Sequence, residues 1–208
     1  MAREAEQLLV HALAGDRGAV EVTARDVLQR HGVQFLYESV VQPALERVGE
    51  LWRANRITVA DEHLATATVQ AAIAGLYGEY PWPRRGERKV LVACVEGERH
   101  DLGARMFADL AALEGWDDVY LGADVPLDAL VAKVVEARPA VVALSLTIAF
   151  HLPALRAAIA RMRTVASAPG IVVGGRAALE VPDLADLTGA DAVARSASQG
   201  VEAIRAWR

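Results

Sequence analysis

The stretch Lys89–Val95, KVLVACV, runs directly into Glu96–Gly103, EGERHDLG, and decides the fold of the chain. The first part is almost wholly apolar, which is typical of a strand buried on both faces. The polar turn leads into a helical pattern at Leu102–Glu114. A buried strand that passes through a short loop into a helix is half of a βαβ unit, so the stretch predicts a parallel sheet covered by helices.

The same alternation of strand and helix continues toward the end of the chain. Right-handed crossovers between such elements predict a doubly wound parallel sheet of the Rossmann or flavodoxin-like type, with five strands over residues 88–208. The other expected strands are Asp118–Leu121, Ala140–Leu146, Ile171–Val173 and Ala192–Ala194, and the other helices are Leu127–Ala137, Leu152–Val165 and a last one near Gln199–Trp207.

The first eighty residues follow a helical period instead. Breaks at residues 15–18, 31–32 and 54–56 divide them into about four helices with short connections. This pattern predicts an antiparallel four-helix bundle over residues 1–80. Two prolines and a glycine in Tyr80–Gly86 then exclude a continuing helix and predict a linker. The expected fold class is therefore α/β, with an N-terminal four-helix bundle before the sheet domain.

One helix boundary in the bundle is sharply marked. Thr58 and Asp61 have the spacing of a capping box, which predicts a helix that begins at Thr58. The preceding helix is expected to end near Arg53. Because so short a turn makes the two helices antiparallel, Trp52 is expected to lie beside Glu62 and His63.

Composition narrows the class of protein. The 208 residues are 53% hydrophobic and carry a formal charge of −5, so a globular core is expected and direct nucleic-acid binding is disfavoured. The single cysteine, Cys94, indicates a reducing compartment. The sequence has neither an apolar stretch of membrane-spanning length nor a signal-peptide pattern, so we expect a cytoplasmic protein without a membrane partner.

The loop after the first strand carries the candidate chemistry. In open parallel sheets, ligands bind beyond the carboxyl ends of the strands, where His100 lies. Glu98, two residues earlier, can accept a hydrogen bond from one ring nitrogen and so prepare the other as a metal ligand. Gly103 allows a bulky ligand to approach the first turn of the helix. On spacing alone, a solvated loop histidine is an equal alternative.

Glu98-x-His100-x-x-Gly103 resembles the Asp-x-His-x-x-Gly motif of the cobalamin-binding Rossmann-like domain. Ser145-Leu146-Thr147 and Gly174-Gly175 are similar to two further elements of that family, in the same order. The resemblance implies base-off/His-on binding, with His100 on cobalt. The remaining residues that it implies for cofactor binding are Glu98, Arg99, Asp101, Leu102 and Gly103 around the ligand, and Ser145, Thr147, Gly174 and Gly175 along the nucleotide tail.

Trp52, nine residues and then Glu62-His63 resemble the Trp-x9-Glu-His motif of B12-dependent photoreceptors of the CarH/LitR type. The resemblance implies that Trp52, with Val59, Glu62 and His63, caps an adenosyl group whose photolysis shifts the bundle. Arg53 stands where some relatives have a histidine, and arginine cannot replace it as a cobalt ligand.

We expect a stand-alone photoreceptor without the DNA-binding domain of that family, rather than an enzyme. Its output then passes through self-association, as a homo-oligomer, or through a protein effector. The layout also resembles the photocobilins, which implies a bilin such as biliverdin as a second chromophore. Any bilin would be noncovalent because Cys94 lies within the apolar first strand.

Three alternatives from other classes stay open. One is a corrinoid methyl-carrier protein of a methyltransferase system, which has the same layout. Another is a cobalamin-binding isomerase subunit or B12 store. The last is a doubly wound protein-interaction module that binds no cobalamin.

Overall fold

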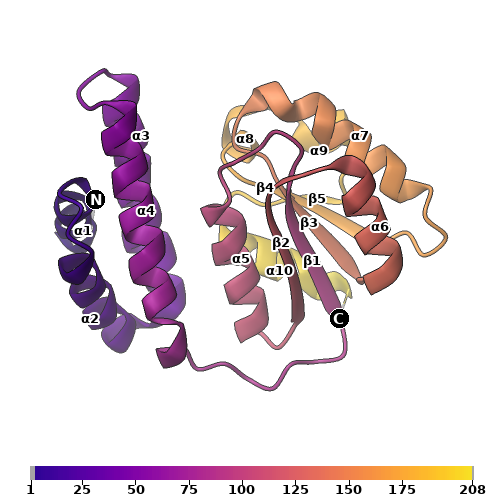
Figure 1. Ribbon diagram of the computed structural model, residues 1–208. Helices are drawn as coiled ribbons and strands as arrows, with labels where there is room; N and C mark the ends of the chain where they lie inside the picture. Colours follow the sequence, from indigo (N-terminus) through magenta and orange to yellow (C-terminus); the bar gives the residue numbers. More distant parts are fainter. Residues whose placement is uncertain (1–2, 208) are drawn as a thin grey trace. The chain divides into compact units, whose positions relative to one another are not determined.

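The computed structural model describes residues 3–207, and this part of the chain divides into two compact units that meet between Pro81 and Trp82 (Figure 1). The expected domain limits at Met1 and Arg208 lie outside the described residues. No helix between residues 3 and 207 is both long enough and apolar enough to cross a bilayer.

The first unit is helical, as expected. The break expected at His31-Gly32 is a kink inside one helix, because Gly32 has a φ of 83° and a ψ of 175°. Tyr37 is fully buried, and its hydroxyl accepts a hydrogen bond from the Tyr80 hydroxyl at 3.0 Å. The elements are α1 (Arg3–Leu13), α2 (Arg17–Phe35), a π-helical segment η1 (Leu36–Val41), α3 (Gln42–Arg53), α4 (Val59–Gly75) and a 3-10 turn η2 (Tyr77–Glu79).

The boundary between α3 and α4 confirms the predicted capping box. The Asp61 N–H donates to the Thr58 hydroxyl oxygen at 3.2 Å, and the Thr58 N–H donates to the Asp61 carboxylate at 2.8 Å. α3 ends at Arg53, and Thr58 is the N-cap of α4. Local sequence chemistry alone therefore fixes where the chain reverses between these helices.

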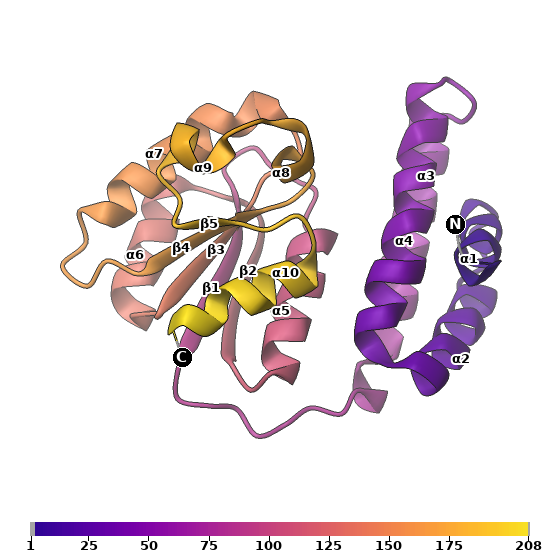
Figure 2. The same cartoon turned by 180° about the vertical axis from the view of Figure 1, so that it is seen from behind.

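The second unit contains the predicted parallel sheet (Figure 2). Between residues 82 and 207 it has five strands in the order β2-β1-β3-β4-β5. In this order β2 is added on one side of β1, and β3 and the later strands are added on the other side. The point between β1 and β3 is therefore the switch point of a flavodoxin-like fold. The strands are β1 (Lys89–Val95), β2 (Asp117–Val125), β3 (Val141–Ser145), β4 (Gly170–Gly174) and β5 (Ala192–Val193).

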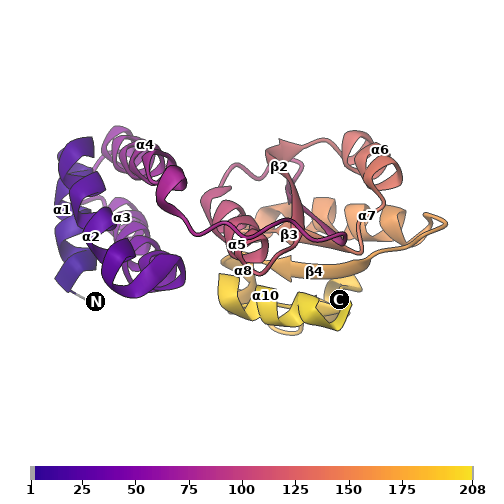
Figure 3. The same ribbon diagram turned by 90° about the horizontal axis from the view of Figure 1, so that it is seen from below.

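Helices cover both faces of this sheet (Figure 3). α5 (Leu102–Leu113) packs against α10 (Ala197–Ile204) on one face, and α6 (Leu127–Ala137) packs against α7 (Leu152–Arg163) on the other. The sequence did not predict α8 (Ala177–Glu180) or α9 (Leu184–Thr188), because helices this short give no periodic signal. Two 3-10 turns, η3 (Ala149–His151) and η4 (Arg205–Trp207), complete the unit.

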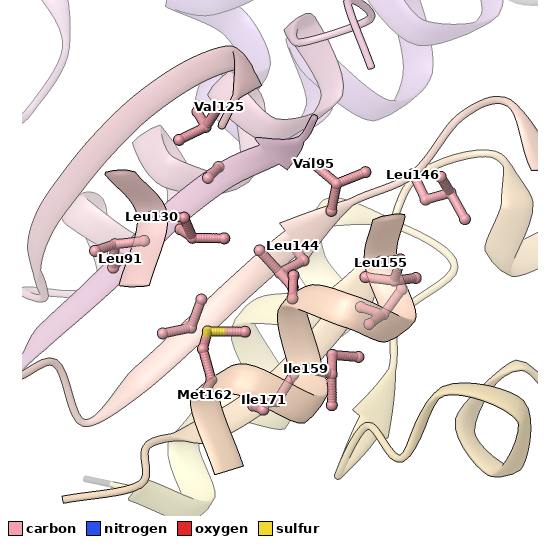
Figure 4. Packing of buried hydrophobic residues seen from close by; sticks show 14 of the residues in the cluster. Leu91, Val95, Val125, Leu130, Leu144, Leu146, Leu155, Ile159, Met162 and Ile171 are labelled. Carbon is pink, nitrogen blue, oxygen red and sulfur yellow. The ribbon is translucent and has the colours of Figure 1, made fainter. Parts of the chain in front are cut away.

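The core on the α6 and α7 face is closely interdigitated (Figure 4). Leu91 and Leu144 project from neighbouring strands toward Leu130 of α6 and Ile159 of α7, and all four side chains are almost fully buried. The strands are held here by apolar packing, which leaves the loops at their carboxyl ends to carry polar side chains.

The turn after β4 depends on Gly175. Its φ is +93°, and a Cβ added to it would lie 2.4 Å from the carbonyl oxygen of Leu146. That oxygen is held in place because it accepts a hydrogen bond from the Ala177 N–H at 3.0 Å. A side chain at this position would meet both backbone strain and a fixed backbone atom.

We predict that Gly175→Ala lowers the free energy of unfolding by about 2–3 kcal/mol, because strain and collision add. Gly115→Ala is the matched control: Gly115 has a φ of +86°, but an added Cβ would meet no atom within 4 Å. The control should lose only about 1 kcal/mol. Urea unfolding of the full chain measures both, and equal losses would contradict the role assigned to the Leu146 carbonyl.

Candidate functional site

The candidate site lies at the carboxyl ends of β1 and β3, on the two sides of the switch point. The loop after β1 carries Glu98 and His100, and the loop after β3 begins at Leu146. The His100 side chain is 56% exposed, whereas the Glu98 side chain is completely buried. An exposed imidazole is therefore backed by a carboxylate that water does not reach.

The Glu98 carboxylate joins these two loops. Its Oε1 accepts hydrogen bonds from the His100 N–H at 2.9 Å and from His100 Nδ1 at 2.6 Å. Its Oε2 accepts from the N–H groups of Thr147 at 2.8 Å and Ile148 at 2.9 Å. The hydrogen bond that the sequence predicted between Glu98 and the His100 ring is present.

Burial by itself would raise the pKa of Glu98, but the hydrogen bonds from His100, Ile148 and Thr147 outweigh it and lower the pKa to about 2. Glu98 is thus a carboxylate at neutral pH and can only accept hydrogen bonds. His100 Nδ1 must then carry the proton of the neutral ring. This tautomer gives Nε2 the lone pair that a metal ligand requires.

The neighbouring residues of the loop differ in exposure. Arg99 is exposed, and the Asp101 carboxylate accepts a hydrogen bond from the Tyr120 hydroxyl at 2.9 Å. Leu102 opens α5, and a Cβ added to Gly103 would meet no atom within 4 Å. The first turn of α5 therefore leaves open space beside His100.

Ser145 and Gly174 are register partners at the ends of β3 and β4. Cys94 is the partner of Ser145 on β1, so three small residues lie side by side across the carboxyl edge of the sheet. Thr147 binds Glu98 through its backbone, and Gly175 makes the strained turn described above. The predicted tail-binding residues thus lie along one edge, next to the Glu98–His100 pair.

The predicted residues of the bundle flank the turn between α3 and α4. Trp52 is 46% exposed and Val59 is 52% exposed, so both side chains offer apolar surface to solvent. Glu62 binds His63 Nδ1 at 2.5 Å and the Thr66 hydroxyl at 3.0 Å. This end of the bundle therefore presents an indole together with a polar pair.

Sequence reasoning missed the contribution of β2. Asp124 accepts a hydrogen bond from the Gly97 N–H at 2.7 Å, and Tyr120 binds Asp101. The His151 ring also packs so closely on Gly97 that a Cβ added to Gly97 would lie 2.7 Å from His151 Nδ1. The nearest signal was the turn-forming composition of Gly122–Pro126, which does not indicate the residues it will contact.

The residues present fit a corrinoid. A single imidazole, fixed through Nδ1 and exposed at its other side, is the donor that a base-off cobalamin lacks. Open space beside Gly103 and small residues at the ends of β1, β3 and β4 suit a large flat ligand with an extended tail. The chemistry of the donor set thus agrees with the resemblance found in the sequence.

Comparison with known proteins gives the same result. Residues 88–205 match the family described as the B12 binding domain, and residues 4–77 match a second family of that description. The HTH-type transcriptional repressor CarA of Myxococcus xanthus is 33% identical over 172 residues, which cover 82% of this chain and 57% of that protein. The trimethylamine corrinoid protein of Methanosarcina barkeri is 29% identical over 114 residues, 53% of this chain and 52% of that protein.

The chain spans about half the length of these curated relatives. The structure of the monomethylamine corrinoid protein of Methanosarcina barkeri superposes with a TM-score of 0.81 at 17% identity and covers 94% of each chain, which shows a shared fold. Since the B12 binding domain match alone covers more than half of the sequence, the chain belongs to the B12-binding domain family and is a cobalamin-binding protein related to CarA.

Proposed function

We propose that this protein is a cytoplasmic light sensor that binds adenosylcobalamin base-off/His-on through His100. Residues 88–208 form the binding domain in this proposal, and the bundle of residues 1–80 forms the cap, with Trp52 over the upper face. When bound, the cofactor supplies a cobalt–carbon bond that visible light breaks. The observation that carries the proposal is the buried Glu98 carboxylate that fixes the exposed His100 ring.

Within the binding domain, Glu98 has two tasks. One oxygen keeps the proton on His100 Nδ1, so that Nε2 is prepared as the lower ligand. The other oxygen binds the backbone of Thr147 and Ile148 and keeps the loop after β3 in place. Ser145 and Gly174, at the carboxyl ends of β3 and β4, then hold the displaced nucleotide tail together with Gly175.

Within the bundle, Trp52 and Val59 offer the apolar surface of the cap, since both side chains are about half exposed. An indole can lie flat against the adenine of an adenosyl group and still present its N–H. Glu62 and His63 supply polar contacts beside it. Loss of the upper ligand would leave this apolar surface without its partner, which favours a rearranged bundle.

The rearrangement is read out as a change in association, either between copies of this chain or with a protein effector. A bilin such as biliverdin is proposed as an optional second chromophore. It would be held noncovalently, because Cys94 is fully buried and burial, assisted by Asp101 and Glu98, raises the pKa of its thiol to about 12.

A corrinoid methyl carrier is the second candidate. The similarity to the trimethylamine corrinoid protein favours it, as does the fold shared with the monomethylamine corrinoid protein. A methyl carrier must open its upper face to a partner enzyme, whereas a light sensor must close over an adenosyl group. The upper face therefore distinguishes the two functions.

The first test is dark reconstitution with adenosylcobalamin, followed by absorption spectra and association measurements before and after green light. We predict a base-off/His-on spectrum and a light-dependent change in mass by light scattering. Glu98→Gln should weaken binding by about tenfold, and His100→Ala, which removes the ligand itself, should weaken binding more than Glu98→Gln does. His31→Ala, an exposed histidine of the bundle, is the control and should bind normally.

Binding that survives His100→Ala unchanged would contradict the ligand assignment. Retained cobalamin with no change in association after illumination would favour the methyl carrier. Absence of any bound corrinoid in wild type would overturn both candidate functions.

The second test concerns the cap. We predict that Trp52→Ala weakens binding of adenosylcobalamin by about tenfold or more and leaves methylcobalamin binding nearly unchanged, because only the adenosyl group reaches the indole. Trp82→Ala, a linker tryptophan that is 41% exposed, is the matched control. Isothermal titration with each cofactor measures the selectivity, and equal losses for both cofactors would contradict the assigned role.

A further inference from the structure

The edge strand β2 departs from regular pairing beside the His100 loop. Val92 of β1 pairs with Tyr120, but Val95 pairs with Val125, so β2 contains extra residues between these two points. Within this bulged part, Gly122 has a φ of 81° and Asp124 a φ of 51°. Bulges at sheet edges bend a strand and redirect its side chains.

The bend brings Asp124 to the amino-terminal side of the His100 loop. Its carboxylate accepts a hydrogen bond from the Gly97 N–H at 2.7 Å, and its own N–H donates to the Glu98 carbonyl at 2.8 Å. A positive φ is uncommon for any residue other than glycine, and such strain persists where the surrounding structure requires it. At Asp124 the strained backbone places two hydrogen-bonding groups on the ligand loop.

Tyr120, on the same strand, holds the carboxyl-terminal side of the loop. Its hydroxyl donates to the Asp101 carboxylate at 2.9 Å, and its ring lies 5.1 Å from the guanidinium carbon of Arg105. Asp101 is the N-cap residue of α5, yet its side chain makes no capping hydrogen bond there. The carboxylate that would ordinarily cap the helix is directed to β2 instead.

From this geometry we propose that Asp124 and Tyr120 are positioning residues for the cobalt ligand His100. Glu98 sets the orientation of the imidazole ring, but the backbone that carries Glu98 and His100 is held on either side by these two residues of β2. The inference rests on the proposed function, because it assigns the contacts of Asp124 and Tyr120 with the His100 loop a role in metal ligation. It predicts that loosening β2 contacts impairs ligation even where His100 and Glu98 are intact.

Three variants of Asp124 separate strain from hydrogen bonding. Asp124→Asn keeps an oxygen acceptor and tolerates the positive φ, so hydroxocobalamin binding should stay within about twofold of wild type. Asp124→Gly relieves the strain but removes the acceptor and should weaken binding by about tenfold. Asp183→Gly makes the same change at a φ of 53°, where the side chain does not cap its helix, and is the matched control.

The apo protein gives a readout that does not depend on the cofactor. Amide hydrogen exchange should rise at Gly97 and His100 in Asp124→Gly but not in Asp124→Asn. Tyr120→Phe, which keeps the ring and removes the hydroxyl, is a second variant and should weaken binding in the same direction. In the hydroxocobalamin complexes of Asp124→Gly and Tyr120→Phe, the visible spectrum should shift from that of the His-on form toward that of a base-off form in which no histidine binds the lower face of cobalt.

Wild-type affinity and a wild-type spectrum in both Asp124→Gly and Tyr120→Phe would overturn this inference. The proposed function would stand, since the wild-type protein would still bind cobalamin. An equal loss of affinity in Asp124→Asn would also overturn the inference, because that variant keeps the side-chain oxygen that accepts from the Gly97 N–H. Failure of wild type to bind hydroxocobalamin would overturn the proposed function and this inference with it.

Discussion

The Glu98 carboxylate is the interaction on which the site depends. An ionised carboxylate with no exposed surface is stable in a protein only if its oxygens are fully hydrogen-bonded. Here the donors come from its own loop and from the loop after β3, so a single side chain spans the switch point of the sheet. Neither loop can move away without leaving a buried charge unsatisfied.

The length of the side chain matters to this arrangement. The related motif has an aspartate in this position, and the glutamate here is one methylene longer. That reach allows Glu98 to bind the His100 ring with one oxygen while the other meets the N–H groups of Thr147 and Ile148. The imidazole is thereby fixed between the two loops that follow β1 and β3, and this is the preorganisation that a metal ligand needs.

Much of this arrangement could be predicted from local sequence. The apolar run at Lys89–Val95 gave β1 with its observed bounds, and Thr58 and Asp61 gave the start of α4. The Glu98–His100 hydrogen bond followed from residues two positions apart, which are close in space whatever the rest of the chain does.

The remainder depends on contacts between distant residues. The contact of Asp124 with Gly97 requires a bulge in β2 and a positive φ, and neither leaves a periodic pattern in the sequence. The short helices α8 and α9 were missed because segments of four or five residues leave no repeating pattern in the sequence. The shared role of Trp52 and His100 rests on motif resemblance, because each belongs to a different unit.

The most direct measurement is electron paramagnetic resonance of cob(II)alamin bound to protein that carries ¹⁵N only in its histidines. If His100 is the lower ligand, the cobalt lines of the labelled protein split into doublets, and those of unlabelled protein split into triplets. His100→Ala should lose this isotope dependence. Triplets in the labelled protein would mean that the cofactor's own base stays on cobalt, and they would contradict ligation by His100.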